Sequence, residues 1–469
     1  MMSRLSSLTL LPDAIAQPSY DRANLQPGII HMGLGAFHRA HQAVYTQRAL
    51  SEQFGAWGIV AVNLRSPDPV EALAEQDGLY SIIVRNAEGD TAEVIGATVD
   101  WLCAAERGTD VLDYLANETI KIVTLTVSEK AYGLDPVTGG LDLKHPSVAA
   151  DLANPHAPVG AVGFLVEGLA KRREKGIAPY TVLCCDNLPS NGHVVRRLVL
   201  DMAERRDPEL ARWIAENGAF PCSMVDRIVP AATAESRARA EALLGVEDTL
   251  SIETEPFMQW VIEENFVSGR PAWEAGGAVF AKAVEPYEKM KLRLLNGPHT
   301  MIAHLGILND LEFVRDVMAV PEFVEKVRRH MQAAVKTLDP VPGIDLPAYM
   351  DELVERFANP TIAHKNIQIA MDTSQKLPQR VLAATVETLE AGQDAAEFAY
   401  VIALWIASIH KRGNLDDPRR EEILAAAGNV DPSDPSASFF AIDGLFPPAL
   451  VQNRAWRDRV NAELQSLKV

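Results

Sequence analysis

Residues 29–39 read IIHMGLGAFHR, and no other stretch says as much about the expected architecture. Its first four residues predict a short buried strand that ends in a glycine turn, and the residues up to 50 continue with helical periodicity. In the usual dinucleotide-binding fingerprint, the first glycine makes the tight turn, the second admits the pyrophosphate and the third permits close helix–strand packing. Gly33 and Gly35 supply the first two, whereas His38 stands in the third position. The stretch predicts the first unit of a dinucleotide-binding domain, with an ordinary strand–helix turn as the alternative.

The segments downstream alternate between strand-like and helix-like patterns. Residues 57–64, 121–127 and 180–185 are apolar strand candidates, residues 160–175 predict a helix, and residues 79–96 predict a hairpin. Strands that alternate with helices indicate a parallel sheet with helices on both faces. We therefore expect an α/β, Rossmann-type doubly wound sheet in the N-terminal part of the chain.

From about residue 285 the pattern becomes helical. Helices are expected over residues 290–308, 321–338, 346–358, 379–391, 395–411 and 419–427. Residues 401–407 are apolar almost all round and should lie in a core. Because 469 residues are too many for one ordinary core, we predict two domains: a dinucleotide-binding domain at 1–284 and a mainly α-helical substrate and catalytic domain at 285–469.

Composition excludes several classes of function. The net charge is −19, from 44 Lys and Arg against 63 Asp and Glu, and such a surface repels nucleic acid. No apolar run is long enough to span a bilayer, and no signal segment is recognisable, so a cytoplasmic protein without a membrane partner is predicted. The four cysteines lack a CxxC pairing, so buried reduced thiols are expected rather than a zinc site. The oligomeric state is left open between a monomer and a small homo-oligomer.

The predicted cofactor contacts follow the first two strands. In the glycine turn they are Gly33, Gly35, Phe37, His38 and Arg39. Arg39 is expected to contact the pyrophosphate. The two histidines of the run His38-Arg-Ala-His41 have a spacing that suits two metal ligands, but capping of the helix is the preferred interpretation.

The end of the second strand bears on the choice of cofactor. Asp68 can accept hydrogen bonds from the adenosine ribose and repel a 2′-phosphate, which favours NAD. Arg65 could bind that phosphate and favours NADP. We predict NAD, with NADP as the alternative.

A second informative stretch, PYEKMKLRLLNGPHTMIAHLG at residues 286–306, holds Lys291, Asn296 and His299. Oxidation of a secondary alcohol needs a base for the hydroxyl proton, donors for the developing oxyanion and a hydride acceptor. A lysine buried near a nicotinamide cation has a lowered pKa and can act as that base. Pro298 should kink or interrupt the helix. The alternative is a solvated lysine followed by a core helix.

Asn187 is a further candidate. It follows the strand candidate at 180–185, at the carboxyl end of the strand, where open α/β sheets bind ligands. The alternative is an asparagine of an ordinary turn.

Seven motifs occur in order along most of the chain: GLGAFHRAHQ (33–42), CDNLPSNG (185–192), MVDRIVP (224–230), EPFMQWVIE (255–263), KLRLLNGPH (291–299), RFANP (356–360) and QIAMDTSQKLPQR (368–380). On these motifs the chain resembles the polyol-specific long-chain dehydrogenases, the family of mannitol 2-dehydrogenase, arabinitol 4-dehydrogenase and fructuronate reductase. The resemblance implies a zinc-independent NAD(P) oxidoreductase that acts on CH–OH groups, with a Rossmann-type domain followed by a helical domain.

The resemblance also implies roles for individual residues. Lys291 would be the general base, Asn187 and Asn296 the oxyanion hole, and His299 a group that positions the substrate. Further implied contacts are Val225 and Asp226 beside the nicotinamide and substrate, Glu288 as a proton-exchange partner of Lys291, and Lys376 at the substrate oxygens.

One position separates the branches of the family. Mannitol-oxidising members carry an arginine eight residues before the equivalent of Lys376, where this chain has Gln368, and the motif at 368–380 is similar to that of fructuronate reductases. Thr373 stands where the family has glycine, so the local backbone should differ. The first choice is therefore the interconversion of D-mannonate and D-fructuronate, with Lys376 and Arg380 as carboxylate partners. The alternatives are oxidation of mannitol or arabinitol, a non-catalytic NAD-binding redox sensor and, least favoured, a scaffold protein.

Overall fold

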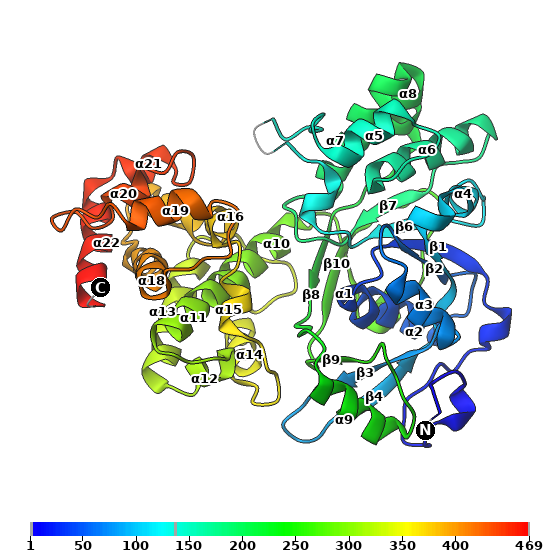
Figure 1. Cartoon of the computed structure of the whole chain (residues 1–469), viewed down its shortest axis with the longest axis horizontal. Helices are drawn as coiled ribbons and strands as arrows, with labels where there is room; N and C mark the ends of the chain where they lie inside the picture. Colours follow the sequence, from blue (N-terminus) through cyan, green and yellow to red (C-terminus); the bar gives the residue numbers. More distant parts are fainter. Residues whose placement is uncertain (1–2, 136–137, 468–469) are drawn as a thin grey trace. The chain divides into compact units, whose positions relative to one another are not determined.

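The computed structural model describes residues 3–135 and 138–467, and the chain divides into two compact units, Met1–Glu285 and Pro286–Val469 (Figure 1). The first unit contains a five-stranded sheet in the order β5-β2-β1-β6-β7, in which every neighbouring pair is parallel. Its strands are β1 (Pro27–Met32), β2 (Gly58–Asn63), β5 (Thr98–Cys103), β6 (Ile122–Leu125) and β7 (Thr181–Cys184). In chain order this is the 3-2-1-4-5 arrangement of a Rossmann-type sheet, as predicted.

Alternate residues of the strands enter two different cores, because successive side chains of a strand point to opposite faces. In β1, Ile30 and Met32 pack in one core, with α4 (Ala104–Leu115), α6 (Ala161–Glu174), α7 (Asn191–Arg206) and α8 (Pro208–Asn217). Ile29 packs in the other core, with α1 (Ala36–Ala40), α2 (Gln42–Glu52) and α3 (Asp68–Glu75). The sheet is therefore covered on both faces, which explains its near-continuous apolar strands.

The predicted helix over residues 37–50 is wrong in one respect. The structure has two helices, α1 and α2, separated by His41, whose φ of −129° and ψ of −86° are not helical. The predicted capping is met in position only: His41 is the C-cap residue of α1 and the N-cap residue of α2, but its side chain makes no capping hydrogen bond to α2. Gly35 is the N-cap residue of α1, and His38 lies inside α1. The break directs the side chain of His41 to the carbonyl of Gln259, 2.8 Å away.

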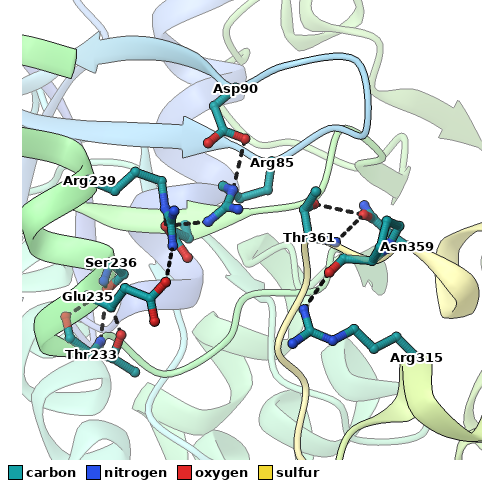
Figure 2. A network of polar contacts seen from close by, with 11 residues as sticks. Arg85, Asp90, Thr233, Glu235, Ser236, Arg239, Arg315, Asn359 and Thr361 are labelled. Atoms are coloured by element: carbon teal, nitrogen blue, oxygen red, sulfur yellow. Dashed lines mark hydrogen bonds and ion pairs between the residues drawn. The ribbon is translucent and has the colours of Figure 1, made fainter. Parts of the chain in front are cut away.

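Two three-stranded sheets complete the first unit. One contains the predicted hairpin of β3 (Tyr80–Val84) and β4 (Thr91–Ile95), with β9 (Ile252–Thr254) parallel to β3. Ion pairs fasten it: Arg85 contacts Asp90 and Glu253, both at 2.8 Å, and Arg239 of α9 (Ala234–Leu244) contacts Glu253 at 2.7 Å (Figure 2). The other sheet was not predicted and pairs β8 (Ser223–Asp226), β10 (Gln259–Glu263) and β11 (Val279–Ala281).

The second unit is mainly helical, as predicted. Its helices are α10 (Glu285–Lys291), α11 (Gly297–Leu308), α12 (Val314–Met318), α13 (Pro321–Val335), α14 (Leu346–Ala358), α15 (Asn366–Ile369), α16 (Thr373–Leu377), α17 (Ala383–Glu390), α18 (Ala396–Arg412), α19 (Arg420–Ala427), α20 (Ala437–Phe440), α21 (Pro448–Val451) and α22 (Arg454–Ser466). Every residue from Phe398 to Ile409 of α18 is buried, which confirms the expected core position of 401–407.

Two helical segments of this unit contain a π-helical turn. Leu292–Asn296 joins α10 to α11, with the Gly297 N–H bonded to the Leu292 carbonyl, and Pro378–Leu382 joins α16 to α17 in the same way. Pro298 is near the first turn and Pro378 begins the second, and each lacks the N–H of a normal α-helical bond. The predicted interruption near Pro298 is therefore a widened turn rather than a break.

Two expectations about the whole chain can be compared with the residues that the structure describes. All four cysteines are free and buried, as predicted. Among those residues, no helix is both long and apolar enough to cross a membrane.

Candidate active site

The glycine turn after β1 requires its two glycines for different reasons. Gly33 has a φ of 105°, and a Cβ there would lie 2.1 Å from the carbonyl oxygen of Thr126. Any other residue would therefore force the turn apart. At Gly35, apart from its two chain neighbours, the one atom of the described residues within 4 Å of an added Cβ is the Gly33 carbonyl oxygen, at 3.9 Å. Gly33 shapes the turn, whereas Gly35 leaves open space above it, which suits the close approach of a pyrophosphate.

Histidine pairing explains why His38 replaces the third glycine. Its ring stacks on that of His31 in β1, with centroids 3.3 Å apart and planes 10° from parallel. The nitrogens of His31 lie 2.7 Å from the Thr124 hydroxyl and 2.8 Å from the Thr126 hydroxyl, which also donates to the Gly33 carbonyl. Burial lowers the pKa of His31 to about 3. Two neutral, flat rings thus provide the close helix–strand packing that glycine usually provides.

A cavity of about 380 Å³ lies at the carboxyl ends of β1, β2 and β6. It is lined by Gly33, Leu34, Gly35, Asn63, Leu64, Arg65, Ser66, Thr126, Val127, Ser128, Lys130, Ala131, Ser147, Val159, Gly160 and Ala161. A second cavity of about 530 Å³ shares Leu64, Arg65, Ser147 and Val159 with it. Asp68 is exposed in the first turn of α3, outside both linings. Ligands of open α/β sheets bind at this edge, so the two cavities are the candidate cofactor site.

Asp186 fixes one wall of this cavity. Its carboxylate accepts hydrogen bonds from the N–H groups of Val127 and Ser128, at 3.0 and 3.1 Å, and from the Tyr132 hydroxyl at 2.7 Å. Burial raises the pKa of Asp186 to about 6 against the effect of these donors. Ser128 has a φ of 72° and a ψ of 152°, a conformation that other residues than glycine rarely adopt. Sequence reasoning missed Asp186 as a positioning residue, although it lies inside the CDNLPSNG motif.

Asn191 of the same motif connects the loop after β7 to the neighbouring sheet. Its amide donates to the carbonyls of Asp186 and Ser223, at 3.0 and 2.8 Å, and its oxygen accepts from the Ser223 N–H at 2.9 Å. Asn187 is exposed in this loop. On β8, Val225 and Asp226 are buried and pair with Trp260 and Gln259 of β10. Asn191 therefore ties the loop that carries Asn187 to the start of the strand that carries Val225 and Asp226.

Besides Asp68, the predicted cofactor residues outside the lining of both cavities are Phe37, His38, Arg39, Val225 and Asp226. The guanidinium of Arg39 donates to the carbonyl of Leu250 and lies over the Tyr80 ring, 5.5 Å from its centroid. Phe37 stacks on His41, with centroids 4.9 Å apart. The contacts of Arg39 fasten α1 to distant parts of the unit, whereas that of Phe37 is local to the end of α1.

In the second unit, the π turn separates Lys291, which is 7% exposed at the end of α10, from His299, which is 6% exposed in α11. Asn296 ends the turn, and Arg380 of the other π turn lies against it: its guanidinium is 3.4 Å from the Asn296 carbonyl oxygen. A Cβ on Gly297 would lie 3.0 Å from the Arg380 carbonyl. The two π turns therefore pack backbone to backbone beside the predicted catalytic residues.

His299 is surrounded by basic groups. Burial holds the pKa of His299 well below its usual value, and the charges of His364, Arg380, Arg356 and Lys291 lower it further. Its ring packs on Phe357, 4.5 Å between centroids, and its Nε2 has no hydrogen-bond partner among the residues that the structure describes. A neutral imidazole with a free nitrogen among cations can bind a substrate hydroxyl.

His364 lies beside His299 and was missed by sequence reasoning. Its ring meets that of His299 edge to face, 5.4 Å between centroids, and burial together with Lys376 lowers its pKa to about 4. The preceding turn is fixed by the side-chain oxygen of Asn359, which accepts from the Thr361 N–H at 3.0 Å (Figure 2). The RFANP motif therefore shapes the loop that brings His364 to His299.

The remaining residues predicted to contact the substrate lie on different helices of the second unit. Lys376 donates to the carbonyls of Ile369 and Met371, and Gln368 is exposed in α15. Glu288 lies one turn before Lys291 on α10, at a spacing that makes helix residues neighbours. Thr373 is buried with its hydroxyl bonded to the Ala370 carbonyl at 2.8 Å, and the left-handed residue is Asp372, with a φ of 52°. Position 373 therefore does not need a glycine in this chain.

A parallel sheet in Rossmann order, with a two-glycine turn and cavities at its carboxyl edge, defines a Rossmann-type dinucleotide-binding fold. Models of the mannitol dehydrogenase Rossmann domain and the mannitol dehydrogenase C-terminal domain match residues 27–275 and 283–468. The chain belongs to the mannitol dehydrogenase family.

Three similar proteins place it within that family. D-mannonate oxidoreductase of Escherichia coli is 42% identical over 464 residues, which are 97% of this chain and 96% of that protein. The uncharacterized oxidoreductase YeiQ of the same organism is 44% identical over 89% of this chain and 86% of its own length. The structure of Pseudomonas fluorescens mannitol 2-dehydrogenase, a ternary complex with NAD and D-mannitol, matches with a TM-score of 0.90 and 35% identity, covering 100% of this chain and 97% of that one.

Proposed function

We propose that this chain transfers hydride reversibly between NAD(H) and a sugar-derived secondary alcohol, with D-mannonate and D-fructuronate as the first-choice pair. Family membership and similarity to D-mannonate oxidoreductase support the reaction class. The observation that carries the choice of a sugar acid is the pair of guanidinium groups near His299, those of Arg356 and Arg380. In a chain of net charge −19, such a pair favours an anionic substrate.

The first unit is proposed to bind the cofactor and the second to carry the catalytic residues, with the domain boundary predicted between residues 284 and 285. Gly35 leaves room for the pyrophosphate, and Arg65 lies where the two cavities meet. Asp68 is proposed to favour NAD over NADP at the ribose. When bound, the nicotinamide supplies the hydride acceptor.

The proposed proton path uses residues of this chain and needs no metal ion. Lys291 takes the proton of the substrate hydroxyl, and Glu288 exchanges it with solvent. Asn187 and Asn296 donate amide N–H groups to the oxygen as it gains negative charge. His299 is neutral near pH 7 because burial and its basic neighbours hold its pKa low, so its free Nε2 can orient a second hydroxyl.

Arg380 and Lys376 are the proposed partners of the substrate carboxylate, and Gln368 replaces the arginine of mannitol-oxidising members. Oxidation of mannitol or arabinitol is the second candidate. It is supported by the full-length structural similarity to mannitol 2-dehydrogenase.

The direct test is to follow NADH formation from NAD⁺ with D-mannonate, D-mannitol and D-arabinitol in parallel, and to repeat it with NADP⁺. We expect D-mannonate with NAD⁺ to give the highest kcat/KM. In Arg380→Gln, kcat/KM for D-mannonate should fall at least tenfold more than that for D-mannitol, since removing a charged partner of a bound anion is costly. A preference for mannitol or arabinitol would reject the sugar acid. NADH binding without turnover on any of the three would favour a redox sensor instead.

A further inference from the structure

A cluster of potential metal ligands lies in the first unit and includes none of the residues predicted to act in catalysis or cofactor binding. His193 is in the first turn of α7, Cys222 directly precedes β8, and Glu263 ends β10. One ligand atom from each of the three lies within 4.8 Å of the others. The three residues are far apart in sequence, so no short sequence motif indicates the cluster.

Hydrogen bonds to backbone groups hold these three elements together before any ion binds. The Cys222 N–H donates to a carboxylate oxygen of Glu263 at 3.0 Å, and the Glu263 N–H donates to the Cys222 carbonyl at 3.0 Å. Asn191 bonds the start of α7 to both backbone groups of Ser223. Gly192 allows this approach, because a Cβ there would lie 2.4 Å from the Phe220 carbonyl. The cluster is therefore preorganised, and its carboxylate is already oriented by a second contact.

We propose that His193, Cys222 and Glu263 form a Zn²⁺ site. One sulfur, one nitrogen and one oxygen ligand suit zinc, whereas magnesium and calcium prefer oxygen alone. Metal–ligand bonds of about 2.0–2.3 Å place tetrahedral ligands about 3.3–3.8 Å apart. Because the side chain of His193 is exposed and that of Cys222 is buried, rotation of the imidazole can close the remaining gap. Water would take the fourth position.

The proposed ion would join α7, β8 and β10 at one point. β8 carries Val225 and Asp226, so the ion would brace the strand that is predicted to lie beside the nicotinamide and substrate. An ion that binds only the folded chain raises its stability by mass action. The proposed metal site is independent of the identity of the sugar substrate.

The test uses the full-length chain without a histidine tag, stripped of metal and titrated with Co²⁺ and then Zn²⁺. We expect one Co²⁺ per chain, with a thiolate-to-cobalt band in the near ultraviolet that Zn²⁺ displaces at micromolar concentration or below. Saturating Zn²⁺ should raise the melting temperature by several degrees. Cys222→Ser should lose the band, and His193→Gln should weaken binding at least tenfold and lose the thermal shift.

Matched controls separate this site from adventitious binding. Cys185→Ser alters another buried cysteine of the unit, and His156→Gln alters another exposed histidine; both should bind metal as the parent does. Because His193 is exposed, His193→Gln is expected to fold even if Cys222→Ser does not. A missing charge-transfer band, or Zn²⁺ affinity and melting shift unchanged in His193→Gln, would overturn the proposal.

Discussion

The glycine turn of the first unit and the Lys291 region of the second are built in opposite ways. The turn is made of backbone: Gly33 has a φ that other residues rarely adopt, and Gly35 leaves its surroundings open. Around Lys291, side chains from distant segments converge on His299, among them Arg356 and His364. A site made of backbone is visible in a short run of sequence, whereas a site made of converging side chains depends on the packing of the whole unit.

The largest expected effect comes from Lys291→Ala, which tests whether the second unit supplies the general base. Loss of a general base should lower kcat for alcohol oxidation by about 10²–10⁴-fold. The dissociation constant for NADH, measured by fluorescence titration, should stay within about twofold, because the cofactor cavity lies in the first unit. Lys289→Ala is the matched control: that lysine, on the same helix, pairs with Glu387 at 3.1 Å. Retained oxidation in Lys291→Ala would refute the proposed mechanism.

A second effect separates the two glycines of the turn. In Gly33→Ala the new Cβ would meet the Thr126 carbonyl at 2.1 Å and a φ of 105°, so we expect a loss of about 2–3 kcal/mol in stability and no measurable NADH binding. Gly35→Ala should fold normally and bind NADH about tenfold more weakly, because its Cβ only occupies open space. Equal melting temperatures for the two variants would contradict this assignment.

The contrast between the regions also explains what the sequence could and could not predict. The strands of the main sheet, the hairpin and most helices were predictable because hydrophobic periodicity and turn residues are local signals. The break at His41 was missed, since a continuous helical pattern hides a residue whose side chain is held by Gln259. The π turn beside Pro298 could be predicted only as an interruption, because its form depends on packing against Arg380.

The same contrast separates the site residues that were predicted from those that were missed. Gly33, Gly35 and Arg65 were selected from a local motif and line the cavity. Asp186 and His364 lay inside or near recognised motifs, but nothing in their immediate sequence shows that one fixes residues 127–128 and the other packs on His299. Such roles follow from contacts across many residues, which a single sequence does not reveal.

A smaller effect is expected when the packing of the two π turns is disturbed. In Gly297→Ala the added Cβ would lie 3.0 Å from the Arg380 carbonyl and 3.2 Å from Nε2 of His330. We expect kcat to fall about tenfold through a shift of Asn296, since small displacements of positioned groups are costly. NADH affinity should not change. Gly428→Ala, where the nearest atom is 3.5 Å away, is the matched control. Unchanged kcat in Gly297→Ala would show that the turn tolerates displacement.

The smallest effect at neutral pH concerns His330, a fully buried residue whose ring lies beside this turn and meets Phe398 edge to face. Burial lowers the pKa of His330 to about 4. Between that value and about 6.5, the unfolded chain binds a proton here and the folded chain does not, so stability falls as the pH decreases. One such proton changes the free energy of unfolding by up to about 1.4 kcal/mol per pH unit.

His330→Leu should remove this contribution to the pH dependence of the free energy of unfolding, measured by urea unfolding between pH 7 and about 4.5. Activity near pH 7 should change little, because the imidazole is already neutral there. An unchanged pH dependence of the unfolding free energy would mean that His330 is protonated in the folded chain. The turn beside Lys291 would then pack against a buried imidazolium rather than against a neutral ring.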